Sequence, residues 1–327
     1  MAAHSRIVVI GASAGGLDAL RRLLGRLPVN FPAPILVVLH IGSHYSVLPK
    51  ILENDISLPV RHAEDNEPLV PGVVLFAPPD RHLLLEDGMV HLSKGAKENF
   101  SRPAIDPLFR SAAVFYRENA IGIILTGFLD DGTIGLQAIK AYGGVALVQN
   151  PDEADEPSMP RSALDHVDVD ACLSLEGLAD RLLEIVETEP EAAVPSASWH
   201  LIETEGRFDR RQKSSMEELD RIGVPSGFTC PECQGLLWEI NEASPGHFRC
   251  HTGHVFTEQG LNTAQDSLIE EAVWAAVRAL HEKQKLLQRL AKAVGIADRH
   301  DAAREHVAAA NSLAEHAEIL RKLVTQR

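Results

Sequence analysis

Up to about Val186, short apolar runs alternate with segments of helical periodicity. The runs are rich in Val and Ile and contain few polar residues, which is typical of strands covered on both faces. They are Ile7–Ile10, Ile35–Leu39, Val73–Phe76, Ile121–Leu125 and Val145–Val148. Strands that alternate with helices predict an α/β fold, with a doubly wound, mostly parallel sheet and helices on both faces.

Apolar side chains recur at helical spacing between and after these runs, so that each set shares one helix face. The two longest sets are Leu17, Leu20, Leu23, Leu24 and Leu27, and Leu175, Leu178, Leu182 and Ile185. Shorter helices are expected at Pro107–Tyr116 and Ile134–Ala141. Cys172, near a strand end, is expected to be a small buried hydrophobe.

The pattern changes after Val186, and we expect residues 187–226 to be a linker, because Glu187–Ser198 is rich in Glu, Pro and Ala and has no periodicity. Residues 227–260 hold a compact cluster of Cys and His, which we call the Cys/His segment. Residues 261–327 are predicted to form a helical hairpin, with helices at Ala264–Val294 and Ala302–Val324. The apolar stripe on the first helix must be covered by the second helix, by the rest of the chain or by another subunit.

Composition narrows the class of protein. The 327 residues are 45% apolar and carry a net charge of −15, values that exclude dominant disorder and argue against nucleic-acid binding. No apolar run approaches the 18 or so residues of a membrane span, so we expect no membrane insertion. Four cysteines, three of them within Cys230–Cys250, are not a disulfide framework, and we expect a cytoplasmic protein.

The first predicted strand runs into Gly11–Gly16, whose G-x-S-x-G pattern centres on Ser13. Such a turn between a strand and a helix exposes a nucleophilic serine at the carboxyl edge of a sheet. Two alternatives are a helix cap at Ser13 and dinucleotide binding. The spacing is not that of a dinucleotide fingerprint, and the second strand ends at His40 where a ribose-binding acid would be expected.

A catalytic serine needs a base and an acid that orients the base. His40 directly follows the second strand, while the rival bases His44 and His82 lie in loop sequence. Asp130 and Asp131 follow the strand Ile121–Leu125, and we expect one carboxylate to face the site and the other solvent. A Ser, a His and an Asp at three strand ends therefore predict a triad at one edge of the sheet.

Residues 7–186 resemble the CheB-type protein-glutamate methylesterases of bacterial chemotaxis. The segments that carry the resemblance are, in order, Gly11–Gly16, the strand ending in His40, Ser101–Ala113, Leu125–Gly132 and Met159-Pro160. The resemblance covers the catalytic domain only, and because the first strand begins at Ile7 we expect no N-terminal receiver domain.

The resemblance implies hydrolysis of glutamate γ-methyl esters on chemoreceptor helices, with release of methanol, and in many members deamidation of receptor glutamine. It assigns Ser13 as nucleophile, His40 as general base and Asp131 as its partner, and it implies no catalytic cofactor. The backbone N–H groups of Ala14 and Phe128 are the candidates for the oxyanion hole.

The chain departs from the family pattern at Ala14, where the family has Thr, and at Leu129, where it has Gly. Leu enters positive φ less easily than Gly. These departures motivate an alternative function, that of a weakly active or inactive signalling adaptor that uses its C-terminal extension to bind partners. A homo-oligomer formed through the C-terminal helices is a further expectation.

The Cys/His segment contains the spacing C-x2-C…C-x3-H, at Cys230, Cys233, Cys250 and His254. Thiolates and imidazole in a set of four suit a closed, tetrahedral, structural zinc site in a ribbon-like fold. His251 is the alternative to His254, and a reduced segment without metal is the alternative to the zinc site.

Overall fold

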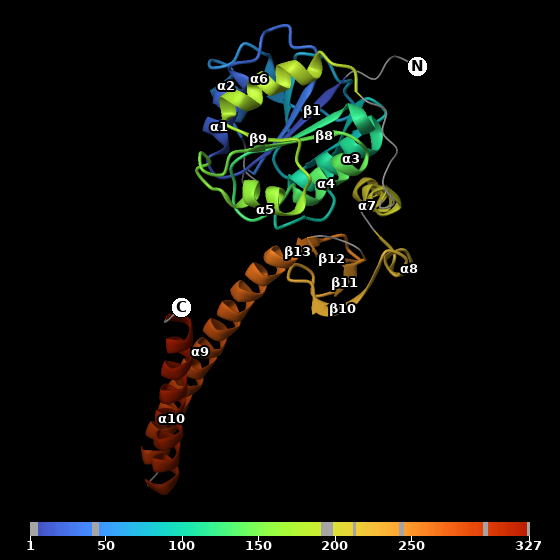
Figure 1. The fold of residues 1–327 in the computed structure, drawn as a ribbon. Helices are drawn as coiled ribbons and strands as arrows, with labels where there is room; N and C mark the ends of the chain where they lie inside the picture. Colours follow the sequence, from blue (N-terminus) through green and yellow to red (C-terminus); the bar gives the residue numbers. More distant parts are fainter. Residues whose placement is uncertain are drawn as a thin grey trace. The chain divides into compact units, whose positions relative to one another are not determined.

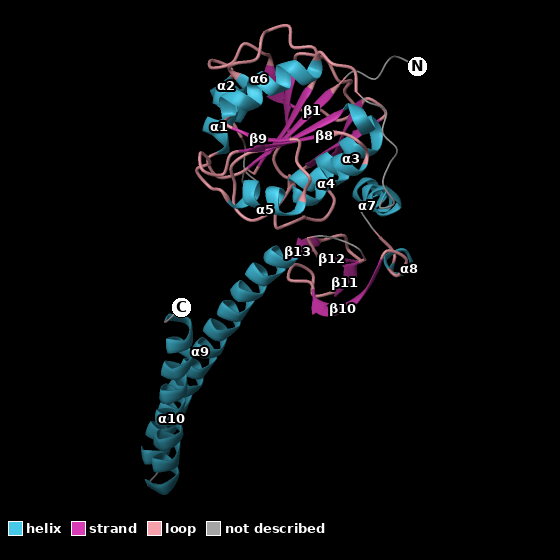
Figure 2. Ribbon diagram, in the orientation of Figure 1, coloured by secondary structure: helices cyan, strands magenta, loops and turns pink. Residues whose placement is uncertain are grey.

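The computed structural model describes residues 6–40, 46–190, 199–211, 214–241, 245–296 and 300–325. The chain divides into two compact units, residues 1–260 and residues 261–327. The first unit holds an α/β layer structure and a small antiparallel sheet, and the second holds helices (Figures 1 and 2). None of the helices within the described residues is both long and apolar enough to cross a membrane.

A seven-stranded sheet, entirely parallel, forms the centre of the first unit in the order β3-β4-β2-β1-β7-β8-β9. The strands are β1 (Ile7–Ala12), β2 (Ile35–Leu39), β3 (Val60–His62), β4 (Val74–Phe76), β7 (Ala120–Ile124), β8 (Val145–Gln149) and β9 (Ala171–Leu173). Every residue of β1, β2 and β7 is buried, as their continuous apolar runs predict.

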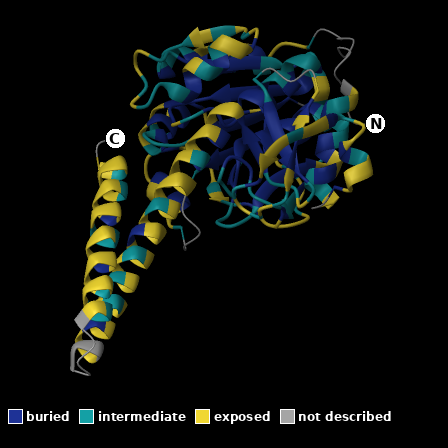
Figure 3. Cartoon of the chain, turned by 90° about the horizontal axis from the view of Figure 1, so that it is seen from below, coloured by how far each residue is buried: buried dark blue, intermediate teal, exposed yellow. Residues whose placement is uncertain are grey.

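Helices cover both faces of this sheet, and dark buried strands lie between them in Figure 3. On one face α1 (Gly16–Leu24) and α6 (Leu175–Val186) pack their leucines against alternate strand residues. On the other face lie α3 (Ile105–Tyr116), α4 (Thr133–Ala141) and α5 (Ser158–His166). The predicted doubly wound α/β fold is therefore confirmed.

The order of the strands indicates which edge of the parallel sheet can carry a functional site. β1 pairs with β2 on one side and with β7 on the other, so the chain reverses its direction of winding beside β1. In open α/β sheets, sites form at the carboxyl ends of the strands that flank such a reversal. The carboxyl ends of β1, β2 and β7 are where Ser13, His40 and Asp131 follow in the sequence.

Several elements have no counterpart among the predicted ones. They include strand β3, the hairpin of β5 (His82–Glu86) and β6 (Met89–Ser93), helices α2 (Leu48–Leu52) and α5, and the short 3-10 helix Arg117–Asn119. Cys172 was expected to be buried, and this is wrong, because β9 is an edge strand and its thiol is exposed. An edge strand is covered less completely than the central strands from which the expectation was drawn.

The range 187–226 was predicted to be a linker, but it holds regular structure. Helices α7 (Trp199–Arg211) and α8 (Met216–Leu219) lie in it, and β10 (Gly223–Thr229) begins in it. α7 packs on α3 through Ile202, and its Glu205 is 2% exposed. The periodicity of α7 is hidden in the sequence because its buried face is partly charged. Residues 191–198, where the linker composition is strongest, lie outside the described residues.

The Cys/His segment folds as a four-stranded antiparallel sheet in the order β10-β11-β12-β13. Its later strands are β11 (Leu236–Ile240), β12 (His247–Cys250) and β13 (Val255–Thr257). Trp238 and Phe248 are both buried, on opposite faces of this small sheet. Trp238 packs with Phe208 of α7 and Leu219 of α8, and the Phe248 ring lies edge-on to Phe228.

Two long helices, α9 (Glu258–Ile296) and α10 (His300–Thr325), make up most of the second unit. They contain the predicted helices and lie side by side (Figures 1 and 3). Much of their surface is exposed, including large apolar side chains. These are Leu268, Ile269, Trp274, Leu286, Leu290, Val307, Ile319 and Leu323.

Candidate active site

Ser13 directly follows β1 and precedes α1. Gly15, in the left-handed region at φ +76°, turns the chain into the helix, and a side chain there would collide with Asp155. The Ser13 N–H donates to the Thr126 carbonyl over 2.9 Å, and the Thr126 hydroxyl donates to the Ala14 carbonyl over 2.9 Å. These bonds hold the serine turn against the end of β7.

His40 follows β2 and lies beside Ser13. Its Nδ1 is 3.1 Å from the Ser13 Oγ, and its Nε2 is 2.7 Å from Asp131 Oδ2. Since an ionised carboxylate only accepts hydrogen bonds, the Nε2–H donates to Asp131, and the Nδ1 lone pair is left to face the serine hydroxyl. The imidazole therefore has the tautomer that a general base requires.

Asp131 lies between β7 and α4 and is buried, with 2% of its surface exposed, and its carboxylate faces the N-terminus of α3. Its carboxylate accepts the backbone N–H groups of Ile105 over 2.8 Å and Asp106 over 3.3 Å. Burial alone would raise the pKa of this carboxyl, but the hydrogen bond from His40 and those from the two backbone N–H groups outweigh burial and lower the pKa. Asp131 is thus a carboxylate at the end of a helix dipole that favours its charge.

The neighbouring Asp130 was expected to face solvent if Asp131 faced the site, and this is wrong. Asp130 is 3% exposed, and its Oδ1 accepts the hydroxyl of Thr257 over 2.8 Å. Burial raises the pKa of Asp130 to about 6. The expectation failed because the Cys/His segment covers a surface that the α/β sequence alone leaves open.

Two further polar residues, Asp106 and Asn99, lie beside Asp131, and the sequence analysis assigned neither of them a role. Asp106, fully buried, accepts the Gly135 N–H over 2.6 Å, and burial together with the Asp131 charge raises its pKa well above the usual value. Asn99 places its Nδ2 at 3.5 Å from both Asp106 and Asp131. Asp106 belongs to the Ser101–Ala113 segment that carries the family resemblance, but the sequence did not predict that its carboxyl would be buried beside Asp131.

Gly127 shows why the turn after β7 needs glycine. A Cβ there would lie 2.1 Å from the Met159 Sδ and 2.7 Å from the Ser13 Cβ. The Met159 N–H also donates to the Gly127 carbonyl over 3.0 Å. Met159, from the Met-Pro motif, is therefore part of the packing that sets the position of Ser13.

Of the two alternative bases, His82 has a structural role. His82 is fully buried, its Nε2–H donates to the Ala96 carbonyl over 2.9 Å, and its Nδ1 accepts the Ala104 N–H. Burial lowers the pKa of His82 to about 4, so it is a neutral structural side chain at neutral pH. His44 lies outside the described residues.

A shallow depression of about 340 Å³ lies over Ser13 and His40, and α1 forms part of its wall. Within the described residues, the N–H groups of Ala14 and Phe128 make no hydrogen bond to the protein. Leu129 adopts φ +62°, the left-handed backbone that a Gly would enter at lower cost.

The four predicted metal ligands lie together at one end of the Cys/His segment. The ligand atoms of Cys230, Cys233, Cys250 and His254 all lie within 4.8 Å of one another. The Cys233 and Cys250 sulfurs are 3.7 Å apart, and His254 Nδ1 is 3.5 Å from the Cys250 sulfur. Two sulfurs about 2.3 Å from one tetrahedral centre are roughly 3.8 Å apart, so the cluster could hold a metal ion. It contains His254 and not His251.

A comparison with protein families matches residues 8–182 to the CheB methylesterase model. A protein of Leptospira interrogans is 42% identical over 186 residues, which are 56% of this chain and 96% of that protein. The Thermotoga maritima protein-glutamate methylesterase/protein-glutamine glutaminase is 38% identical over 190 residues, which are 57% of this chain and 55% of that protein.

Among solved structures, the catalytic domain of the Thermotoga maritima CheB methylesterase matches with a TM-score of 0.54 and 37% identity. The match covers 56% of this chain and all of that domain. The matched family model spans the seven parallel strands and the serine, histidine and aspartate at their carboxyl ends. The chain belongs to the CheB methylesterase family.

Proposed function

We propose that this protein hydrolyses glutamate γ-methyl esters on chemoreceptors, with Ser13, His40 and Asp131 as its catalytic triad. The observation that supports this most strongly is the unbroken path from the Ser13 Oγ through the two ring nitrogens of His40 to Asp131, with separations of 3.1 and 2.7 Å. The names of the relatives supply the substrate class, which the geometry alone does not specify.

The chemistry follows from this path. His40 Nδ1 takes the hydroxyl proton as the Ser13 Oγ attacks the ester carbonyl, and the imidazolium then gives that proton to the departing methoxide, which leaves as methanol. Water next attacks the acyl-enzyme by the same route and regenerates the serine. Asp131, held ionised by the first turn of α3, orients the ring and stabilises its positive charge.

The oxyanion of each tetrahedral intermediate would be bound by the N–H groups of Ala14 and Phe128. Each lost donor of this kind costs about 3 kcal/mol of barrier stabilisation in comparable enzymes. A glutamine side chain could enter the same cycle with ammonia as the leaving group, so we propose glutaminase activity as a second reaction of the same site.

A serine-directed fluorophosphonate tests the nucleophile independently of the substrate. We expect stoichiometric labelling of Ser13, located by peptide mass spectrometry, and no labelling of this peptide in Ser13→Ala. His40→Ala should label at least about tenfold more slowly, because the hydroxyl loses its base. Equal labelling rates for wild type and His40→Ala would favour an inactive adaptor on the same scaffold.

We also propose a structural zinc ion bound by Cys230, Cys233, Cys250 and His254. The donor set of three sulfurs and one imidazole is complete, which suits a closed site rather than a catalytic one. Metal analysis of the purified protein should give one zinc per chain. Cys233→Ser should lower that content, whereas Cys172→Ser, at an exposed cysteine outside the cluster, should leave it unchanged.

The division of the chain follows from these assignments. We propose a catalytic domain at residues 1–186, a Cys/His domain at 227–260 and a helical hairpin at 261–327, in a protein that works in the cytoplasm. The intervening residues 187–226 connect the first two parts through α7 and α8.

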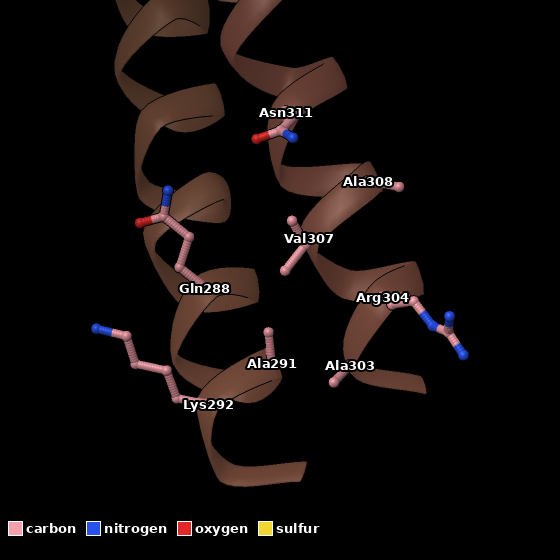
Figure 4. Close-up of a pocket in the computed structure, with 8 residues that line it drawn as sticks. All are labelled: Gln288, Ala291, Lys292, Ala303, Arg304, Val307, Ala308 and Asn311. Atoms are coloured by element: carbon pink, nitrogen blue, oxygen red, sulfur yellow. The ribbon is translucent and has the colours of Figure 1, made fainter. Parts of the chain in front are cut away.

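For the hairpin, we propose self-association with a second copy of the chain. A groove of about 1030 Å³ runs between α9 and α10, and Ala291 and Val307 point into it (Figure 4). Leu290, Ile319 and Leu323 are 41–61% exposed, and two hairpins could bury such side chains in a four-helix bundle. Light scattering should show a smaller particle for Leu323→Glu than for the control Lys322→Glu.

A further inference from the structure

The Cys/His segment is joined to the α/β layer by backbone pairing. The Asn99 N–H donates to the Val255 carbonyl over 2.9 Å, and the Val255 N–H donates to the Lys97 carbonyl over 3.3 Å. β13 thereby pairs with the stretch that immediately precedes the Ser101–Ala113 motif. This contact lies within the first compact unit of the chain.

Buried charges strengthen the same contact. Arg110 of α3 and Arg249 of β12 share the carboxylates of Glu98 and Asp209 at 2.7–3.3 Å. The four side chains are 1–6% exposed. A buried charge is costly unless it is paired, so these ion pairs favour the packing of α3, α7, β12 and the stretch that carries Glu98 against one another.

A second set of hydrogen bonds leads from this contact to the triad. The Thr257 N–H donates to the Asn99 Oδ1 over 3.1 Å, which turns the Asn99 Nδ2 towards Asp131 Oδ1 and Asp106 Oδ2. The Thr257 hydroxyl donates to Asp130, the residue next to Asp131. Thr257 is completely buried, and Asn99 is 5% exposed.

We propose that Thr257 and Asn99 are positioning residues for Asp131, and that the Cys/His segment is thereby an integral part of the active site. Among the described residues, neither side chain is hydrogen-bonded to Ser13 or His40; each acts by fixing a carboxyl of the Asp130–Asp131 pair. This inference rests on the proposed function, because a fixed Asp131 matters only to a working triad.

The proposed metal ligands lie directly before β13, the strand that makes this contact. The Cys250 N–H donates to the His254 carbonyl over 3.0 Å, which closes the turn that leads into β13. With Cys250 and His254 as ligands, a bound ion would hold this turn and, through it, the start of the strand that carries Thr257. We therefore expect metal removal to disturb Asp131 as well as the segment itself.

The test compares three variants of the full chain, assayed for methanol release from methylated receptor. Thr257→Val keeps the shape but removes the hydroxyl, and Thr257→Ser restores the hydroxyl. Asn99→Asp keeps the shape, tolerates the left-handed backbone at φ +46° and removes the N–H donors. Ser226→Ala is the control, because its hydroxyl donates to the Leu237 carbonyl between β10 and β11, in the same small sheet but not to Asp130 or Asp131.

We expect kcat to fall between about 10- and 100-fold in Thr257→Val and Asn99→Asp, with KM within about twofold of wild type, because the triad is misplaced and not the substrate. Thr257→Ser should recover most of kcat, and Ser226→Ala should match wild type. Thr257 also caps α9 by accepting the Gly260 N–H, so circular dichroism must first show that each variant is folded.

The low-field proton resonance of the His40 Nε2–H, assigned by its loss in His40→Ala, provides a readout that needs no substrate. It should shift or broaden in Thr257→Val, in Asn99→Asp and after metal removal by a chelator. Folded variants with unchanged kcat and an unchanged resonance would overturn the proposal. A wild type without Ser13-dependent methanol release but with the expected spectral shifts would overturn the proposed function alone.

Discussion

At the residue scale, the site is defined by close packing as much as by its three polar side chains. A side chain at position 127 would collide with both Ser13 and Met159, so the turn after β7 can approach β1 only with glycine there. Leu129, two residues later, takes up the left-handed backbone that the sequence flagged as unfavourable for Leu. The strain of about 1–2 kcal/mol that this implies is offset by the surrounding fold.

Gly127→Ala should therefore impair both stability and catalysis. The added methyl group displaces Met159 or Ser13, which should cost about 1–3 kcal/mol of unfolding free energy and at least about tenfold in kcat/KM. Urea unfolding and ester hydrolysis measure the two effects. Gly206→Ala is the matched control, because its added Cβ meets no atom closer than 3.7 Å. Equal effects of the two substitutions would show that the close approach at Gly127 is unimportant.

Asp130 predicts a pH dependence of stability. Burial raises its folded pKa from 3.8 to about 6, so the folded chain holds this proton more tightly than the unfolded chain. The resulting stabilisation is fully present below about pH 4 and is lost as the pH rises through about 6. Asp130→Asn should thus exceed wild type in unfolding free energy by on the order of 2 kcal/mol above that range, and the difference should shrink in acid.

Urea unfolding across this pH range checks the prediction, with Asp168→Asn, at an exposed carboxyl, as control. A difference between Asp130→Asn and wild type that does not vary with pH would contradict it.

At the element scale, the apolar pattern predicted the central strands, which are buried on both faces, and the helices α1, α3, α4 and α6, each of which buries one apolar face. The three residues of the proposed triad could be brought together from strand ends because parallel strands present their carboxyl ends at a common edge. Helix α7 was missed, since Glu205 and Asp209 on its buried side read as solvent-exposed charges. Nothing in the sequence pointed to Asn99 and Thr257. They are 158 residues apart, and their hydrogen bond depends on how the two segments pack in the folded chain.

The reactivity of the four cysteines tests both the exposed position of Cys172 and the closed metal site. Cys172 on the edge strand β9 is exposed, whereas the other three cysteines lie in the proposed metal site. A maleimide should add once to the native, metal-loaded chain and four times after chelation and unfolding, as counted by intact mass. Cys172→Ser should reduce the native count to zero. Rapid modification of Cys230 or Cys250 in the native protein would contradict a closed metal site.

At the scale of the whole molecule, the compact unit of residues 1–260 contains the triad, the Cys/His segment and their buried contact, while the helical hairpin forms a unit of its own. The sequence indicated a Cys/His module appended to an esterase. The buried carboxylates and guanidinium groups of Glu98, Asp209, Arg110 and Arg249 instead tie this module to the catalytic layer. This could not be predicted from spacing, since charged residues are ordinarily exposed.

Truncated chains test whether activity depends on the helical hairpin or on the Cys/His segment. A chain that ends after Gly260 should retain kcat within about twofold of the full protein, because the triad and its supports are all present. A chain that ends after Arg211 keeps α7 but lacks the Cys/His segment, and it should lose most of kcat even where circular dichroism shows a folded α/β layer. Equal activity of the two truncated chains would contradict the coupling described above.

The central claim is that Ser13, His40 and Asp131 act as one catalytic unit, and methanol release from methylated receptor measures it most directly. Wild type should release methanol continuously, Ser13→Ala and His40→Ala should stay at the background rate, and Asp131→Asn should fall by about 10³-fold or more. Comparable release by all four proteins would contradict the claim.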